Sequence, residues 1–253
     1  MIGVFDSGLG GLSVLAALVE ALPQADFAYY ADTAHVPYGN KSEALIQRRV
    51  LAIGEHLAKG GCGLLVVACN TATAAAVQAL RAAHPGIPVV GVEPGIKPAA
   101  QETRSGRIAV LTTEATAGSQ RLKHLIRDHA RQVEVFVEPC PGWATHVEKL
   151  QLDDPALAAD VRARVEPLLE QGVDRIVLGC THYSFLAPLL REVAGTRAQL
   201  VDVADAVARQ TQRLAGGLAH GSGRLLLQAS AHPERLRAAL PRLNLGHIAA
   251  RVA

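Results

Sequence analysis

The sequence predicts an α/β protein built from two similar three-layer domains with mostly parallel sheets, related by a pseudo-two-fold axis. Two observations lead to this fold class. The first is a pair of apolar strands, in segments 64–69 and 175–180, that each run into a cysteine. The second is a pattern that restarts near residue 100: Ile108 lies 106 residues after Ile2, and the second cysteine lies 111 residues after the first. Similar spacing at two places favours a duplicated unit, with a candidate site in the cleft between the halves, at the carboxyl ends of the strands.

The hydrophobic pattern of the first half predicts short apolar strands that alternate with amphipathic helices. Glycine-rich segment 6–11 separates the first strand from the first helix, which Pro23 ends. Ser42 is a suitable N-cap for the second helix. The expected order is a strand at 2–5, a helix to Leu22, a strand at 27–31, a helix from Ser42 to Gly60, a strand ending at Cys69, a helix at 72–83, a strand at 88–92 and a helix near Ala99.

The second half repeats this alternation. The expected order is a strand at 108–111, a helix at 116–130, a strand at 133–137, a long loop at 138–153 with one helical turn, a helix from Pro155 to Gln171 bent at Pro167, a strand ending at Cys180, a loop at 181–185, a helix with Pro188 in its first turn and a strand at 199–201. The segment after Asp205 has too little core to stand alone, so we expect it to pack on the first half. The predicted domains are therefore 1–97 plus 206–253, and 98–205.

Composition excludes several classes of protein. Of the 253 residues, 49% are hydrophobic and 19% charged, which excludes a disordered chain. The formal net charge is +2 and no basic run is present, so we expect no nucleic-acid partner. No apolar stretch approaches a membrane span and no signal peptide is recognisable, which predicts a cytoplasmic protein. The four cysteines lack metal-like spacing and are expected to be free thiols; no metal is expected.

Cys69 and Cys180 are the candidate catalytic residues. A lone cysteine is most often buried packing, which is our interpretation of Cys62 and Cys140. Cys69 and Cys180 differ because each ends a strand next to polar residues and ahead of a helix N-terminus, where partial positive charge favours a thiolate. Two thiols placed equivalently in two halves suit a reaction that needs a proton acceptor and a proton donor on opposite faces of one carbon.

Asp6 and His182 are the candidate helpers of these thiols. Each would ordinarily be a cap or a surface group. However, His182 lies two residues after Cys180, so both side chains can face one side of an extended segment. Asp6 ends the first strand and should share a sheet edge with Cys69. Each thiol would then have its own proton-accepting or orienting group.

The glycine-rich loop that begins at Ser7 is a weak signal by itself, and its usual meaning is a strand-to-helix turn. It lacks the lysine of a phosphate-binding loop and the acidic residue of a dinucleotide site. We interpret it as a nest of backbone N–H groups and hydroxyls for a carboxylate. In the second half, Thr113 takes the place of Ser7. Further neutral donors for a carboxylate are Asn70, Thr71, Thr181 and the backbone of Tyr38 and Gly39.

Five motifs together resemble those of glutamate racemases in the aspartate/glutamate racemase superfamily, over nearly the whole chain. They are 2–14 (IGVFDSGLGGLSV), 31–39 (ADTAHVPYG), 68–72 (ACNTA), 91–95 (GVEPG) and 179–183 (GCTHY). The resemblance implies two α/β domains with the site between them, no cofactor or metal, often a homodimer, and a role in supplying D-glutamate for cell-wall peptidoglycan. Segments 142–143 and 145–146, with Leu122 and Ser184, depart from the pattern of the superfamily.

The resemblance also implies residue roles. Cys69 and Cys180 would be the two bases, assisted by Asp6 and His182 respectively. Glu148 would be a further catalytic residue near the cysteine–histidine side, although the sequence alone gives little reason to single it out. The substrate, glutamate, would be bound by Asp6, Ser7, Tyr38, Gly39, Asn70, Thr71, Thr113, Thr181 and His182.

Three alternatives stay open at this level. A racemase for aspartate or another small acid would use the same chemistry, and segment 6–14 argues against it. A non-catalytic amino-acid binder with this fold would not need two thiols with helpers. A metal site is the weakest alternative, because two cysteines and a histidine are too few ligands unless Asp6 joins them.

Overall fold

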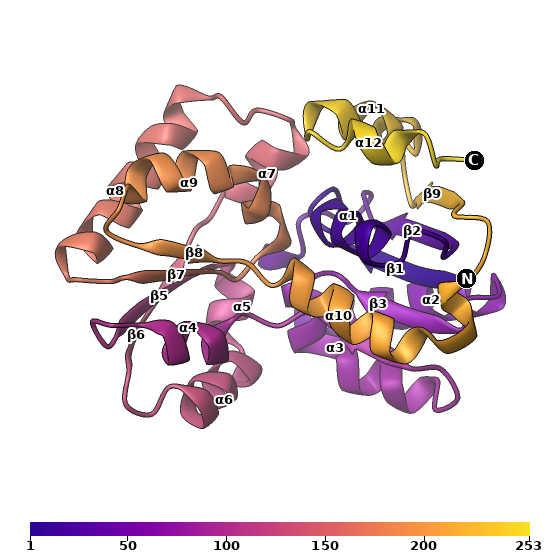
Figure 1. Cartoon of the computed structure of the whole chain (residues 1–253), viewed down its shortest axis with the longest axis horizontal. Coiled ribbons are helices and arrows are strands. Elements are labelled where there is room, and N and C mark those ends of the chain that lie inside the picture. The colour runs from indigo at the N-terminus through magenta and orange to yellow at the C-terminus, as the bar shows by residue number, and fades with distance from the viewer.

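The computed structural model describes residues 1–253 as an α/β molecule with two parallel sheets. The two sheets lie in separate halves, each flanked by helices (Figure 1). The first sheet has the order β4-β3-β1-β2-β9, from strands β1 (Ile2–Asp6), β2 (Phe27–Ala31), β3 (Leu64–Val67), β4 (Val89–Gly91) and β9 (Leu225–Ala229). The second has the order β6-β5-β7-β8, from β5 (Arg107–Thr112), β6 (Glu134–Pro139), β7 (Arg175–Leu178) and β8 (Gln199–Val201).

The strand order is the same in the two halves. The first four strands in each half follow the spatial order fourth, third, first, second, and every pairing is parallel. Because the same order recurs, the third strand in each half, β3 or β7, lies beside the first strand of its half. The two cysteines follow these third strands. The predicted fold class, two similar α/β units with parallel sheets, is confirmed.

The helices cover both faces of each sheet. In the first half α2 packs on α3, and α1 packs on α10; in the second, α8 packs on α9, and α4 on α6. Their bounds are α1 (Leu12–Ala21), α2 (Glu43–Lys59), α3 (Asn70–Ala83), α4 (Ile96–Glu102), α5 (Glu114–Gly118), α6 (Gln120–His129), α7 (Trp143–Glu148), α8 (Pro155–Glu170), α9 (Ala187–Ala194), α10 (Ala204–Ala215), α11 (Glu234–Arg242) and α12 (Gly246–Ala249). Short 3₁₀ helices are η1 (Tyr38–Asn40), η2 (Thr181–Leu186) and η3 (Gly216–Ala219).

The C-terminal elements lie against the first half. β9 pairs with β2 in parallel, with Phe27 opposite Leu225, and α10 packs against α1. Figure 1 shows α11 and α12 above this half. The domain boundaries 1–97 plus 206–253 and 98–205 stay a prediction, although the strands of the two sheets fall on either side of them.

Three sequence-based expectations about elements are wrong. The helix expected at 116–130 is two helices, because Ser119 adopts an extended conformation and its hydroxyl caps α6. The loop expected at 181–185 is the 3₁₀ helix η2. Helix α3 begins at Asn70 and not at residue 72, because Cys69 is its N-cap.

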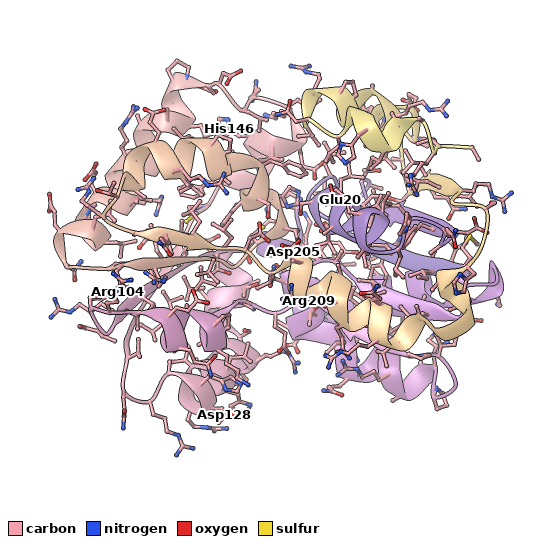
Figure 2. The ribbon with its side chains drawn as sticks, viewed as in Figure 1. Glu20, Arg104, Asp128, His146, Asp205 and Arg209 are labelled. Atoms are coloured by element: carbon pink, nitrogen blue, oxygen red, sulfur yellow. The ribbon has the colours of Figure 1, made fainter.

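Buried residues are mostly aliphatic, and most charged side chains lie outside; Asp6, Asp32 and Arg175 are buried exceptions. The largest apolar cluster spans both halves and includes strand residues such as Ile2, Val4 and Leu178. Figure 2 shows charged side chains around the outside, among them the exposed residues Arg104 and Asp128. None of the helices combines the length and apolar composition needed to span a bilayer.

Candidate active site

Both candidate cysteines lie at carboxyl ends of strands and are nearly buried. Cys69 follows β3, and its Sγ accepts the backbone N–H of Ala72 at 3.4 Å in the first turn of α3. Cys180 follows β7 and precedes η2. Their exposed fractions are 6% and 7%, and neither is in a disulfide bond. Each thiol therefore lies in an enclosed, weakly solvated environment.

Asp6 connects Cys69 to the second half of the molecule. The thiol of Cys69 lies 4.0 Å from the Ser7 hydroxyl, which donates to Asp6 Oδ1 at 2.9 Å. The backbone N–H of Gly8 also donates to Oδ1, at 3.0 Å. The hydroxyl of Thr181, beside Cys180, donates to Asp6 Oδ2 at 2.8 Å. One carboxylate thus contacts the neighbours of both thiols.

The surroundings of Cys69 favour its neutral form. Burial raises the pKa of the Cys69 thiol far above its ordinary value, and the nearby charges of Asp6 and Cys180 raise it further. Burial also raises the pKa of Asp6, although the charge of His182 and three hydrogen bonds oppose this. A charge changes the pKa of another group only when the two are close. The effect of Cys180 on the pKa of Cys69 therefore indicates that the two thiols lie near each other.

Cys180 belongs to a second chain of polar contacts. Its Sγ lies 3.6 Å from His182 Nδ1, and His182 Nε2 lies 2.6 Å from Glu148 Oε1. The same carboxylate oxygen accepts the backbone N–H of Leu9 at 2.6 Å, so α7 in the second half is tied to the glycine-rich loop of the first. Burial alone would lower the pKa of His182, but the hydrogen bonds to Cys180 and Glu148 raise it well above its ordinary value. Both ring nitrogens of His182 therefore have a close polar partner, the Cys180 thiol at one and the Glu148 carboxylate at the other.

In the glycine-rich loop, only glycine fits at positions 8 and 10, because there the backbone approaches the side chains of Glu148 and His182. A Cβ at Gly8 would overlap the Glu148 carboxylate, and one at Gly10 would lie 2.5 Å from His182 Nδ1. The loop therefore brings backbone of the first half against side chains of the second half, which larger residues would prevent.

Neutral polar groups surround the same region. The Thr71 hydroxyl lies 3.0 Å from that of Thr113 and 3.2 Å from that of Thr116, across the two halves. Asn70 is 4% exposed, and neither its Oδ1 nor its Nδ2 has a hydrogen-bond partner. A buried amide without a partner is costly, so it indicates a place where a polar ligand supplies the missing bonds.

The segment after β2 holds the remaining predicted residues. The Tyr38 hydroxyl donates to Asp32 Oδ2 at 2.6 Å and so is used inside the protein. A Cβ at Gly39 would lie 2.9 Å from Thr113 Cβ, which places this backbone against the second half. Asp32 also receives two hydrogen bonds from Arg49, both at 2.9 Å. The sequence-based reasoning assigned no role to Asp32 or Arg49.

The structure thus brings the predicted catalytic residues, with Ser7 and Thr181, into two connected groups at the carboxyl ends of strands. Cys69, Ser7, Asp6 and Thr181 form one, and Cys180, His182 and Glu148 form the other. No three histidine, cysteine, aspartate or glutamate side chains are arranged to hold a metal ion. The roles of all these residues stay predictions.

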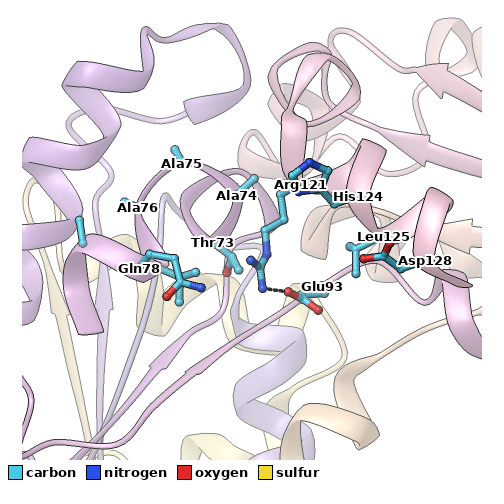
Figure 3. Close-up of a pocket in the computed structure, with 12 residues that line it drawn as sticks. Thr73, Ala74, Ala75, Ala76, Gln78, Glu93, Arg121, His124, Leu125 and Asp128 are labelled. Atoms are coloured by element: carbon cyan, nitrogen blue, oxygen red, sulfur yellow. Dashed lines mark hydrogen bonds and ion pairs between the residues drawn. The ribbon is translucent and has the colours of Figure 1, made fainter. Parts of the chain in front are cut away.

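Other cavities lie beside this region. One of about 490 Å³ reaches Thr71, between α3 and α5. Another, of about 440 Å³, lies between α3 and α6; there Arg121 of the second half forms an ion pair with Glu93 of the first (Figure 3). Neither cavity is lined by Cys69 or Cys180.

Comparison with known proteins gives one consistent result. The family model described as Asp/Glu/Hydantoin racemase matches residues 2–211. The glutamate racemase of Pseudomonas aeruginosa is 45% identical over 244 residues, 95% of this chain and 92% of that protein. That of Ectopseudomonas mendocina is 48% identical over 215 residues, 85% of this chain and 82% of the relative.

Solved structures agree with the sequence relatives. Glutamate racemase isoform RacE1 of Bacillus anthracis superimposes with a TM-score of 0.83 at 30% identity, covering 96% of this chain and 92% of that one. Escherichia coli glutamate racemase, solved with L-glutamate and the activator UDP-MurNAc-Ala, has a TM-score of 0.83 at 33% identity, covering 96% of this chain and 94% of that one.

Proposed function

Because the chain belongs to the Asp/Glu/Hydantoin racemase family, we propose that it interconverts L-glutamate and D-glutamate by proton transfer at the α-carbon. The proposed bases are Cys69 and Cys180, one for each face of the substrate. The observation that carries the proposal is the equivalent placement of these thiols after the third strand of each sheet, with Asp6 and Thr181 hydrogen-bonded between them. The names of the relatives supply the substrate.

The surroundings of the two thiols differ, which supports different starting roles for them: Cys69 as the proton donor and Cys180 as the proton acceptor. The raised pKa of Cys69 keeps it a thiol in the resting protein, able to donate a proton. His182, whose pKa is raised well above its ordinary value, lies 3.6 Å from the Cys180 thiol and is the group that we propose assists Cys180 as a base. In one direction the Cys180 thiolate removes the α-proton and becomes a thiol. Cys69 then delivers its proton to the opposite face and becomes a thiolate, and the reverse direction exchanges these roles.

A carbanion next to a carboxylate is unstable, so the site must offset developing charge. No cofactor is proposed, and neutral donors provide this role. Asn70 has unused hydrogen-bonding capacity, and the Thr71 and Thr113 hydroxyls lie 3.0 Å apart between the halves. Donors fixed in an enclosed site act more strongly than in water, because little solvent screens them. We assign glutamate binding to these groups together with Ser7, Gly39 and Thr181.

The proposal also covers the location, the assembly and the cellular role of the protein. The resemblance of the motifs is what supports a cytoplasmic homodimer that supplies D-glutamate to peptidoglycan synthesis; the names of the sequence relatives given above support glutamate as the substrate. An aspartate racemase is the main rival. A substrate panel separates the two, because glutamate has one more methylene group than aspartate.

The proposal is tested by circular dichroism and deuterium exchange. The signal of L-glutamate should decay to zero with metal chelated and no cofactor added, and the product should carry deuterium at the α-carbon in D₂O. Cys69→Ala and Cys180→Ala should each abolish racemisation. Each variant should still exchange the α-proton of one enantiomer only, because one base remains on one face.

Cys62→Ser is the matched control, since Cys62 is also buried but lies outside the site. It should racemise glutamate at nearly the unmodified rate. Full racemisation by either site variant, or turnover without deuterium in the product, would exclude the two-cysteine mechanism.

A further inference from the structure

Two successive N–H groups of the glycine-rich loop are bound by carboxylates from the two halves. The backbone N–H of Gly8 donates to Asp6 Oδ1 at 3.0 Å, and that of Leu9 donates to Glu148 Oε1 at 2.6 Å. The carbonyl of Gly8 belongs to the same peptide group as the Leu9 N–H, and it accepts the Tyr29 hydroxyl at 2.6 Å. This peptide group is therefore held at both ends, by a carboxylate at its N–H and by a phenol at its carbonyl.

The Tyr29 side chain is fully buried against this loop. β2 pairs with β1, which runs into the loop, and Tyr29 lies opposite Val4. A Cβ at Gly11 would lie 2.9 Å from the Tyr29 hydroxyl oxygen, so the phenol approaches the loop at a second point. Burial raises the pKa of Tyr29 well above its ordinary value, and nearby negative charges, that of Asp6 first, raise it further. The hydroxyl therefore keeps the proton that it donates to the Gly8 carbonyl.

Gly8 is the position at which this peptide group could turn. A Cβ there would overlap the Glu148 carboxylate, so the position excludes other residues. Glycine permits more backbone conformations than any other residue, and the loop gains freedom with it. A half-turn of the peptide group between Gly8 and Leu9 would direct its carbonyl, in place of its N–H, at the carboxylate. The Tyr29 hydroxyl opposes this turn, because it would lose its acceptor in a buried position.

We propose that Tyr29 is a positioning residue for the racemisation, which holds the peptide group between Gly8 and Leu9 with its N–H toward Glu148. The preceding N–H is then kept on Asp6. Tyr29 acts through the loop, since its hydroxyl donates to the Gly8 carbonyl and not to a proposed base. The inference rests on the proposed function, in which the two carboxylates belong to the two groups of catalytic residues.

Steady-state kinetics test the effect on the reaction. Tyr29→Phe removes the hydroxyl and keeps the ring. It should lower kcat by about tenfold or more and change KM by less than about twofold, because the loosened loop misplaces catalytic groups and its turned peptide group is not assigned to glutamate binding. Tyr29→para-aminophenylalanine places an N–H donor where the hydroxyl was, so it should recover most of the lost kcat.

The amide proton of Leu9 tests the orientation of the loop directly. A short hydrogen bond from an N–H to a carboxylate moves the amide proton downfield in the NMR spectrum. In Tyr29→Phe this signal should move upfield and exchange faster with solvent deuterium, and para-aminophenylalanine should reverse both changes. Glu148→Gln should also move the signal upfield, which identifies the bond that it reports.

Tyr183→Phe is the matched control for stability. Tyr183 is also fully buried, and its hydroxyl donates to the backbone carbonyls of Thr112 and Cys140, at 3.2 and 3.1 Å, outside the loop. The two Tyr→Phe variants should therefore lower the free energy of unfolding to a similar extent, which thermal unfolding measures. Only Tyr29→Phe should move the Leu9 signal.

The outcomes separate this inference from the proposed function. If the unmodified protein does not racemise glutamate, the proposed function fails, and the Leu9 signal alone decides whether Tyr29 holds the loop. If it does racemise glutamate, the positioning role is excluded by a Tyr29→Phe variant that keeps full kcat, by an unchanged Leu9 signal in that variant, or by an equal change in Tyr183→Phe. Loss of kcat together with an upfield Leu9 signal, both reversed by para-aminophenylalanine, supports the role.

Discussion

At the scale of single residues, His182 and Cys69 show how burial and close partners together set the pKa of a titratable group. The ring of His182 is nearly buried between Cys180 and Glu148, an arrangement in which burial opposes the imidazolium and two hydrogen bonds favour it. The bonds prevail, because a buried charge is tolerated when it has close partners of opposite charge. Cys69 has no partner of opposite charge, so burial raises the pKa of its thiol and disfavours the thiolate.

We expect Glu148→Gln to lower the pKa of His182, which nitrogen NMR of the labelled protein measures directly. A group with a raised pKa in the folded state stabilises that state fully below its unfolded pKa of about 6.5. That stability is lost as pH rises through the folded-state pKa. Glu148→Gln should therefore lower the free energy of unfolding most below about pH 6.5 and progressively less at higher pH.

Exposed His247 gives a reference signal in the same spectra. A His182 titration that is the same with and without Glu148 would contradict the interpretation, since the carboxylate would then contribute nothing to the imidazolium.

At the scale of elements, the segment after β2 is held by one buried carboxylate. Asp32 receives Arg49 from α2 and the hydroxyl of Tyr38 from η1. Burial would raise the pKa of Asp32, but the hydrogen bonds from Arg49, Tyr38 and Ser230 lower it below its ordinary value. This contribution to stability is present above about pH 3.9 and is lost as pH falls through the folded-state pKa.

Asp32→Asn should lower the stability by about 2 kcal/mol, because it leaves Arg49 without its counter-charge. It should also raise KM more than it lowers kcat, since η1 carries the Gly39 backbone that we assign to substrate binding and no proposed base. Thermal unfolding and steady-state kinetics measure the two effects. Glu55→Gln removes an exposed ion pair on α2, the helix that carries Arg49, and should change neither the stability nor KM. A fall in kcat without a rise in KM in Asp32→Asn would refute the assignment of the Gly39 backbone to substrate binding.

Elements with a strong local pattern were predictable from the sequence. Apolar runs such as 64–67 and the duplicated strand-to-cysteine pattern predict the parallel sheets, because a strand buried on both faces must be apolar throughout. The break at Ser119 was missed because its signal is one hydroxyl within a continuous helical pattern. Asp32 was missed for another reason: Arg49 lies 17 residues away along the chain, and only the fold brings the two together.

In the candidate site too, local sequence patterns identify some residues and miss others that only the fold brings together. Cys69 and Cys180 stand out through duplication, whereas Glu148 has no local signal and was identified only by resemblance. The structure places it on α7, 34 residues before its partner His182. Its position depends on the packing of α7 beside η2, which no periodicity in segment 138–153 indicates.

At the scale of the whole molecule, we expect access to the site to require movement of the two halves. Both thiols are less than a tenth exposed, so little of either sulfur is open to a ligand from solvent. One restraint on such movement is the ion pair between Glu93, which follows β4, and Arg121 on α6 (Figure 3). It joins the halves beside the cavity of about 440 Å³, and each partner is about one third exposed.

We expect Arg121→Ala to increase the population of the open arrangement. A partly exposed ion pair contributes at most about 1 kcal/mol, so the open population should rise by about two- to fivefold. Alkylation of Cys69 and Cys180 by iodoacetamide, followed by mass spectrometry, measures this population, because the closed thiols are shielded. Glu93→Gln should have the same effect, and the double variant should add little to either single variant, because both substitutions remove the same ion pair.

Arg104→Ala, at an exposed position of the second half, controls for the loss of a positive charge. If it accelerates alkylation as much as Arg121→Ala does, overall charge and not the contact between the halves governs access to the thiols.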